Sequence, residues 1–209
     1  MGKHLFKSLV LFASTLSSLA AQAEFISPRT LQAALAAGAP ESAVREASDY
    51  LESHASQFPN KKFLTLIDFT RHSGQKRMFI LDLVNEKVDA LLVAHGKNSD
   101  KDNDGYATEF SNVSESLTSS LGFFKVAERF SGDHGTSLRM DGLESRNDKA
   151  RARGIIIHAA DYVRPDLEKM GRSWGCPAVE TKWMATLANR LEQGSLLYAY
   201  IQDIHERSL

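Results

Sequence analysis

The chain has little cysteine, no excess of charge of one sign and no long hydrophobic run beyond its first residues. With one cysteine in 209 residues, no disulfide can form within the chain. The 25 lysines and arginines nearly balance the 26 aspartates and glutamates, whereas nucleic-acid-binding domains carry a clear basic excess. The paired cysteines and the H-x-x-x-H spacing typical of zinc sites are also missing. We therefore expect no internal disulfide, no nucleic-acid partner, no metal and no cofactor.

The first 23 residues have the pattern of a secretory signal peptide. Lys3 and Lys7 form a basic start, residues 9–20 form an apolar run, and the triplet AQA at 21–23 resembles a cleavage site. The alternatives are a membrane anchor or a buried first helix, but the apolar run is shorter than the ~20 residues that span a bilayer. We expect cleavage after Ala23, no stable membrane insertion, and export to the periplasm or cell envelope.

Residues 24–59 are predicted to form a helical N-terminal segment. Ser27 is a suitable N-cap, Pro28 suits a first helical turn, and the sequence that follows is rich in Ala, Leu and Glu. Gly38 and Pro40 divide the segment into two predicted helices.

Residues 60–209 are predicted to form one domain that consists mainly of strands. Short runs of β-branched and aromatic residues, separated by polar turns, indicate these strands. The predicted strands are 62–70, 76–84, 87–96, 120–130, 135–143, 153–163 and 195–203, and a helix is predicted at 180–194. The fold class is therefore mainly β (α+β), with the helical segment at its N-terminus.

The only cysteine, Cys176, lies in the turn-forming stretch GRSWGCPAVE at 171–180. An unpaired cysteine in an exported protein is a buried small side chain, half of an intermolecular disulfide, or a reactive thiol. A reactive thiol needs a base, and His158, which ends the apolar run GIIIH 18 residues earlier, is the best-placed histidine. We expect this histidine and the turn to lower the pKa of the thiol.

The turn before the cysteine is suited to hold a negatively charged oxygen. Gly175 permits backbone conformations that are closed to other residues. Such a turn can direct the N–H groups of Gly175 and Cys176, with Trp174 as a third donor, at one oxygen, as an oxyanion hole requires.

Together these residues resemble the catalytic motif of the L,D-transpeptidases. The shared pattern is His158, seventeen intervening residues, and then Ser173-x-Gly175-Cys176. The stretches SSLGFF, HAADYV and GRSWGCPAV are similar to the murein L,D-transpeptidase catalytic domain family, and the resemblance covers residues 60–203. The commoner motif has His in place of Trp174, and it continues with an aliphatic residue and Arg or Asn where this chain has Pro177-Ala178.

The resemblance implies a catalytic β-sandwich and an enzyme that acts on peptidoglycan stem peptides. Cys176 would be the nucleophile and His158 the general base, and Ser173, Trp174 and Gly175 would form the turn that holds the oxyanion. The thioester on Cys176 would be resolved by an amine of a neighbouring stem, which forms a cross-link. The alternatives are a carboxypeptidase or amidase on the same scaffold, in which water resolves the thioester, and a non-catalytic module that binds peptidoglycan.

Other polar residues near these motifs have two interpretations. Arg172, His134 and His95 are candidates for contact with substrate, or are solvated or structural side chains. The basic cluster at 146–153 predicts a solvated loop that leads into a strand. The stretch DKDNDG at 100–105 matches the start of a calcium loop, but Ser111 occupies the position of the bidentate Glu, so we predict a solvated acidic turn.

Overall fold

The computed structural model describes residues 25–202. The predicted signal peptide at 1–23 lies outside the described residues. Between residues 25 and 202, none of the helices has the length and apolar character needed to cross a membrane.

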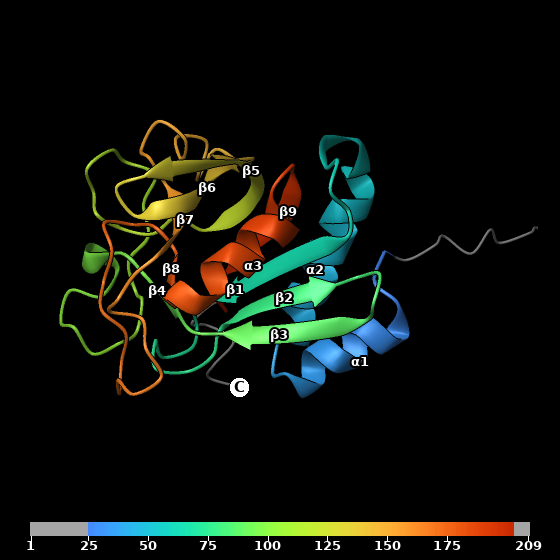
Figure 1. Ribbon diagram of the computed structural model, residues 1–209, viewed down its shortest axis with the longest axis horizontal. Helices are drawn as coiled ribbons and strands as arrows, with labels where there is room; N and C mark the ends of the chain where they lie inside the picture. The colour runs from blue at the N-terminus through green and yellow to red at the C-terminus, as the bar shows by residue number, and fades with distance from the viewer. Residues whose placement is uncertain (1–24, 203–209) are drawn as a thin grey trace, which may run out of the picture.

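A sheet of nine strands forms the body of the described chain (Figure 1). The strands are β1 (Phe63–Asp68), β2 (Met78–Asp82), β3 (Lys87–Leu91), β4 (Val93–Ala94), β5 (Gly122–Gly132), β6 (Gly135–Gly142), β7 (Ile156–Ala159), β8 (Ala178–Val179) and β9 (Ser195–Tyr200). Their spatial order is β3-β2-β1-β9-β5-β6-β7-β8-β4, in which β1 pairs with β9 and β7 with β8 in parallel and the other pairs are antiparallel. The predicted mainly β fold class is confirmed.

The sheet curls strongly, because its two edge strands are almost consecutive in the sequence. β3 stands at one end of the strand order and β4 at the other, yet only Leu92 separates them in the chain. The buried side chain of Arg77 bridges this junction. Its Nε and Nη2 donate to Val93 O at 3.0 and 2.9 Å, while its backbone N–H donates to Leu91 O.

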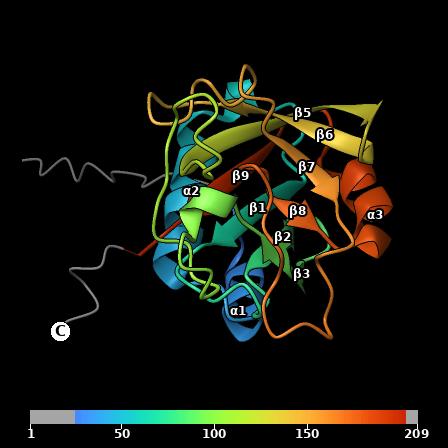
Figure 2. The same ribbon diagram turned by 90° about the vertical axis from the view of Figure 1, so that its left-hand side faces the viewer.

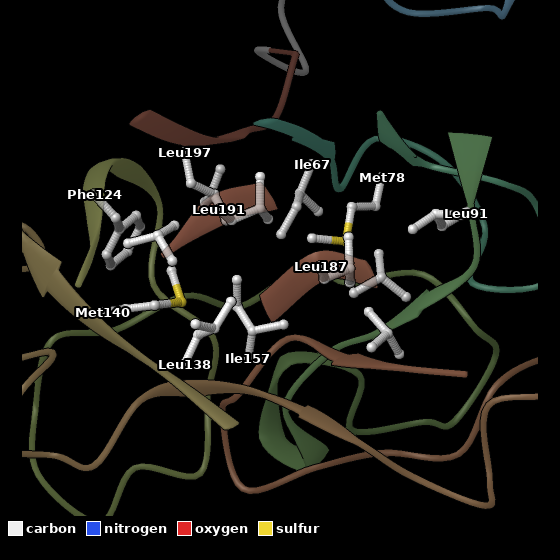
Figure 3. Close-up of a cluster of buried hydrophobic side chains, with 14 of the residues drawn as sticks. Ile67, Met78, Leu91, Phe124, Leu138, Met140, Ile157, Leu187, Leu191 and Leu197 are labelled. Atoms are coloured by element: carbon white, nitrogen blue, oxygen red, sulfur yellow. The ribbon is translucent and has the colours of Figure 1, made fainter. Parts of the chain in front are cut away.

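The first hydrophobic core fills the space between the curled sheet and α3 (Thr181–Leu191). Met184, Leu187 and Leu191 of α3 point into it, and Figure 3 shows apolar side chains from both halves of the sheet converging there. Burial of this continuous apolar surface is the main favourable contribution to the fold.

The N-terminal helices cover the opposite face of the sheet, so that Figure 2 shows the sheet between α2 and α3. They are α1 (Pro28–Ala36) and α2 (Glu41–Ser53), followed by a single 3₁₀ turn at Ala55–Gln57. Ser27 caps α1 as predicted, because its Oγ accepts from Thr30 N at 3.1 Å. A second core of buried apolar residues joins these helices to β1, β2 and β9.

The observed strands differ from the predicted ones in three places. The predicted strand 87–96 is divided into β3 and β4 at the point where the chain crosses from one sheet edge to the other. The predicted strand 153–163 is shortened to β7 at both ends. Gly154 adopts a left-handed conformation (φ 67°) before it, and a turn in which Val163 N donates to Ala160 O follows it. Two-residue β8 was not predicted, since it is too short to show a period.

Candidate active site

The pairing of β7 with β8 places His158, on β7, next to the strand that Cys176 precedes. His158 lies opposite Ala178, and Cys176 precedes that residue by two positions. The Cys176 Sγ is 3.6 Å from the carbonyl oxygen of Gly154. No hydrogen bond joins the thiol to the imidazole within residues 25–202. In free enzymes such catalytic hydrogen bonds are often long, and they tighten when substrate binds.

Ser173 fixes the turn before the cysteine by bonds on both sides of its backbone. Its N–H donates to His95 O at 2.9 Å, and its carbonyl accepts from Lys97 N at 2.7 Å. Its hydroxyl donates to Cys176 O at 2.7 Å and accepts from Gly175 N at 3.0 Å. Ser173 is therefore a structural part of the turn and is 4% exposed.

Gly175 has the conformation and surroundings that only glycine tolerates. Its φ is 127°, and a Cβ at this position would lie 2.6 Å from Thr118 O. The segment 111–120 thus packs directly against the turn. Ser119 reinforces this contact by donating from its hydroxyl to Gly175 O at 3.1 Å.

The donors expected for an oxyanion hole are only partly available. The Gly175 N–H, which the sequence suggested as a donor, is engaged by Ser173 Oγ. The N–H groups of Trp174 and Cys176 have no hydrogen-bond partner in the described part of the chain. These two groups are therefore the free donors of the turn.

The imidazole of His158 is held as an acceptor of protons. His158 is 3% exposed, and its Nδ1 lies 2.9 Å from Ala159 O. Because a carbonyl only accepts, Nδ1 carries the proton in the neutral ring and Nε2 keeps the lone pair. Burial lowers the pKa of His158, the bond to Ala159 partly offsets this, and the nearby His134 lowers it further. The ring is therefore neutral at pH 7, as a general base must be.

The environment of the thiol differs from the sequence-based expectation. Burial raises the pKa of Cys176, whereas the Ile156 N–H and the Arg153 guanidinium favour the thiolate and act in the opposite direction. The net shift is upward, so the expected lowering of the thiol pKa is wrong for the resting protein. The two pKa shifts therefore predict that the thiol of Cys176 and the imidazole of His158 are both neutral in the resting protein.

His95 lies behind the turn and not at its surface. It is 1% exposed, its Nδ1 accepts from Arg77 Nη2 at 2.8 Å, and its Nε2 donates to Asp100 Oδ2 at 3.2 Å. Burial, and then the charge of Arg77, lower the pKa of His95 to about 4, although Asp100 opposes this. This position argues against substrate contact and gives His95 a structural role beneath Ser173.

The other two candidates for substrate contact, His134 and Arg172, are more exposed than His95. The ring of His134, exposed in the β5–β6 turn, stacks on His158 with the centroids 4.2 Å apart and an angle of 26°. The guanidinium of Arg172 is half-buried and donates to the carbonyls of Lys97 and Asp100. Trp174 is 78% exposed, next to the nucleophile candidate.

The DKDNDG stretch is not simply a solvated turn. Asp100 is 1% exposed, and its carboxylate accepts from Asp104 N at 2.9 Å and Gly105 N at 3.1 Å as well as from His95. Asp102 and Asp104 remain exposed, and one oxygen from each of the three carboxylates lies within 4.8 Å of the others. Asp100 is thus committed to the polar cluster beneath the turn.

Sequence reasoning missed two residues that interact electrostatically with Cys176. Arg153 was taken as part of a solvated basic loop, but its guanidinium is half-buried and influences the Cys176 pKa. Tyr162 is half-buried, and burial followed by the charge of Cys176 raises its pKa to about 12. Neither has a sequence signal of its own, because their proximity to Cys176 arises only from the fold.

Comparison with known proteins identifies one family. The model of a family described as L,D-transpeptidase catalytic domain matches residues 36–200, which is most of the chain. Among curated proteins, none matches.

Several solved structures are similar to this chain at low sequence identity. An L,D-transpeptidase from Mycobacterium smegmatis has 11% identity and a TM-score of 0.43, with 66% of this chain and 58% of that chain covered. The helical cell shape determining protein Pgp2 from Campylobacter jejuni has 16% identity and a TM-score of 0.42, with 68% and 48% covered. An L,D-transpeptidase from Xylanimonas cellulosilytica has 14% identity and a TM-score of 0.41, with 73% and 69% covered. The chain therefore spans only about half to two thirds of the length of these structures.

Proposed function

Because the chain belongs to the L,D-transpeptidase catalytic domain family, we propose that it is a cysteine acyltransferase acting on peptidoglycan stem peptides. The observation that carries the proposal is the placement of the only cysteine, Cys176, two residues before the partner of His158 in β8, while Nε2 of that histidine is free to accept a proton. A structural cysteine would need neither this histidine nor the surrounding glycine turn.

The proposed reaction begins with proton transfer from the Cys176 thiol to Nε2 of His158. The sulfur attacks the carbonyl carbon at the L-centre of the third stem residue, and the carbonyl oxygen becomes an oxyanion. The N–H groups of Trp174 and Cys176 stabilise this oxyanion. The tetrahedral intermediate then collapses, the bond to the terminal D-alanine breaks, and His158 returns its proton to the leaving amine. Cys176 is left as a thioester.

The resting protonation states favour a base-assisted attack over a permanent ion pair. The lowered pKa of His158 and the raised pKa of Cys176 keep both groups neutral until substrate arrives. The proton moves when the sulfur begins to form its new bond, so that the thiolate charge passes at once to the oxyanion.

The thioester is resolved by an amine of a neighbouring stem, which forms a cross-link, or by water, which makes the protein a carboxypeptidase or amidase. The exposed indole of Trp174 stands beside Cys176 and supports a role in selecting between these acceptors. Trp174→His is expected to keep the thioester but change the ratio of transfer to hydrolysis.

We further propose that residues 1–23 are removed as a signal peptide and that the protein acts in the periplasm or cell envelope. The helical segment 24–59 would then precede a catalytic domain at 60–209. N-terminal sequencing of the exported protein should find Glu24 first, whereas a retained Met1 would indicate an anchor.

The test of the proposed function is mass spectrometry of muropeptides after purified protein is incubated with cell-wall sacculi. We expect new cross-links whose formation is lost in Cys176→Ala, while shortened stems without cross-links would indicate the hydrolase. A profile identical for the wild type and Cys176→Ala, together with retention on sacculi, would instead support the binding module.

A further inference from the structure

Arg153 is held tightly by the segment 111–120. Its Nη1 donates to Ser111 O at 2.6 Å and to Ser120 Oγ at 2.5 Å. Its Nη2 donates to Ser116 Oγ at 3.1 Å and to Thr118 O at 2.8 Å. These four bonds fix the planar guanidinium in one orientation, which a lysine could not reproduce.

The segment that holds Arg153 is itself strained and also supports the catalytic turn. Glu115 and Leu117 have positive φ angles of 61° and 57°, and non-glycine residues in such conformations persist only where their surroundings hold them. The same segment contacts Gly175 through Thr118 O and Ser119 Oγ. The position of Arg153 is therefore coupled to the position of the turn that carries Cys176.

The charge of Arg153 has no anionic partner. All four of its hydrogen bonds go to neutral carbonyls and hydroxyls, and it forms no ion pair with a carboxylate of the described residues. Its Nε is buried and has no hydrogen-bond partner in the described part of the chain. Removing a cation from water without a counter-charge is costly, and even the half-buried guanidinium of Arg153 bears part of this cost. An anion that forms next to it would offset the cost.

The neighbouring anion that can form is the Cys176 thiolate. Gly154, which directly follows Arg153, places its carbonyl oxygen 3.6 Å from Cys176 Sγ. Arg153 and Cys176 also act on each other electrostatically, since each favours the charged form of the other.

Three titratable side chains surround the thiol from the elements packed around it. They are Arg153 before β7, His158 on β7 and Tyr162 after β7. With a pKa of about 12, Tyr162 stays neutral at the pH of the experiment. His158 is neutral in the resting protein, so Arg153 is the cation among these three.

We propose that Arg153 is the counter-cation of the Cys176 thiolate, held in place by the segment 111–120. The proposal rests on the proposed function only in taking Cys176 as the reacting group. Arg153 stabilises the charge that the sulfur carries when it loses its proton, and it does so without receiving that proton.

The test is the pH dependence of alkylation of the thiol by iodoacetamide, followed by intact mass. The chain has one cysteine, so each added mass reports on Cys176 alone. In Arg153→Gln, which removes the charge and keeps an amide donor, the alkylation midpoint should rise by about one pH unit, and the rate below the midpoint should fall about tenfold. Arg153→Lys, which keeps the charge, should recover part of this loss.

Arg151→Gln is the matched control. Arg151 is two residues away, and its guanidinium pairs with Glu128 and Asp141 instead of the segment 111–120. Its variant should have the wild-type midpoint. Circular dichroism and melting curves establish that the compared proteins are folded.

Three results would overturn the proposal. A folded Arg153→Gln with the wild-type midpoint would show that the charge does not act on the thiol. Faster alkylation at every pH would show that Arg153 only packs the segment and shields Cys176. If Arg153→Gln does not fold, Ser116→Ala/Ser120→Ala, which removes two of the four bonds to the guanidinium, takes its place, and an unchanged midpoint in that variant counts against the proposal.

This readout requires no peptidoglycan. A protein that fails to act on sacculi but shows the expected shift in midpoint would retain Arg153 as the counter-cation while contradicting the proposed function. Normal activity on sacculi without a shift of the alkylation midpoint in Arg153→Gln would support the proposed function and contradict the role of Arg153 as counter-cation.

Discussion

Two clusters, each with an arginine and a histidine, flank the turn 173–176, and they differ in how completely their polar atoms are bonded. The closed cluster is Arg77, His95 and Asp100, in which both ring nitrogens, both carboxylate oxygens and each guanidinium nitrogen have a partner. The open cluster is Arg153, His158 and Cys176, in which Arg153 Nε and His158 Nε2 have none among the described residues.

The difference distinguishes a structural cluster from the proposed reactive site, although the two are built of similar side chains. Full bonding locks the closed cluster into one protonation state and fixes Ser173 through the carbonyl of His95. Incomplete bonding leaves the open cluster with a free lone pair, a free N–H and an unpaired charge, all beside a thiol. The following predictions are ordered from the largest expected effect to the smallest.

Loss of either reacting member of the open cluster should remove most of the activity. Because Cys176 and His158 act as a unit, Cys176→Ala, His158→Ala and the double variant should each lower the rate on peptidoglycan by about three orders of magnitude or more, without additivity. Muropeptide analysis measures this rate, and circular dichroism verifies folding. Multiplicative losses in the double variant would show that the two residues act independently.

The closed cluster should make the fold sensitive to acid. Burial lowers the pKa of His95 to about 4, whereas an unfolded histidine has a pKa of about 6.5, so the unfolded chain binds the extra proton between these values. The contribution of neutral His95 to the free energy of unfolding is fully present above about pH 6.5. It is lost as the pH drops towards 4, and the loss amounts to about 3 kcal/mol.

Urea unfolding at several pH values measures the loss, and an NMR titration assigns it. The ring of His95 should stay neutral at pH 5. A His95 resonance that titrates near pH 6.5 would contradict the closed-cluster description.

His134 should tune the base of the open cluster. The ring of His134 stacks on His158, and the charge of His134 lowers the pKa of His158. His134→Ala should therefore raise the pKa of His158 and move the acidic limb of the pH–rate profile about half a pH unit higher. His134→Phe keeps the ring without the charge and should move the limb less. His54→Ala, in the N-terminal helical segment, is the control and should leave the acidic limb unchanged. An equally unchanged limb in His134→Ala would show that His134 does not tune the pKa of His158.

Calcium should have the smallest effect. Asp100 already bonds His95 and two backbone N–H groups, and Ser111 replaces the bidentate ligand of a calcium loop. Melting temperatures with calcium and with a chelator should agree. A rise of several degrees with calcium would mean that the three aspartates bind the ion.

The sequence predicted the open cluster better than the closed one. Cys176 and His158 stand out because one is unique and the other ends a strongly apolar strand. Arg77, His95 and Asp100 come from separate segments that meet only because the sheet curls back on itself at Leu92. A sequence pattern within one segment cannot show this closure. Asp100 was therefore predicted to lie in a solvated acidic turn, and His95 was left as a candidate for substrate contact.

The same reason explains what was missed in the fold. The long strands β1, β2, β5 and β6 carry enough β-branched and aromatic residues to be predicted, whereas β4 and β8 have two residues each and form through pairing alone. Arg153 was predicted to be a solvated charge because its hydrogen-bond partners, in the segment 111–120, lie 33 to 42 residues earlier in the chain.

The central claim, that the open cluster forms an acyl-enzyme on Cys176, is tested most directly by intact-protein mass spectrometry. The protein is incubated with a muropeptide that bears a tetrapeptide stem and is quenched in acid, which preserves a thioester. We predict an added mass equal to the muropeptide minus D-alanine, mapped to Cys176 and missing in Cys176→Ala. Turnover of the muropeptide without such an adduct, or with equal turnover in Cys176→Ala, would contradict the account.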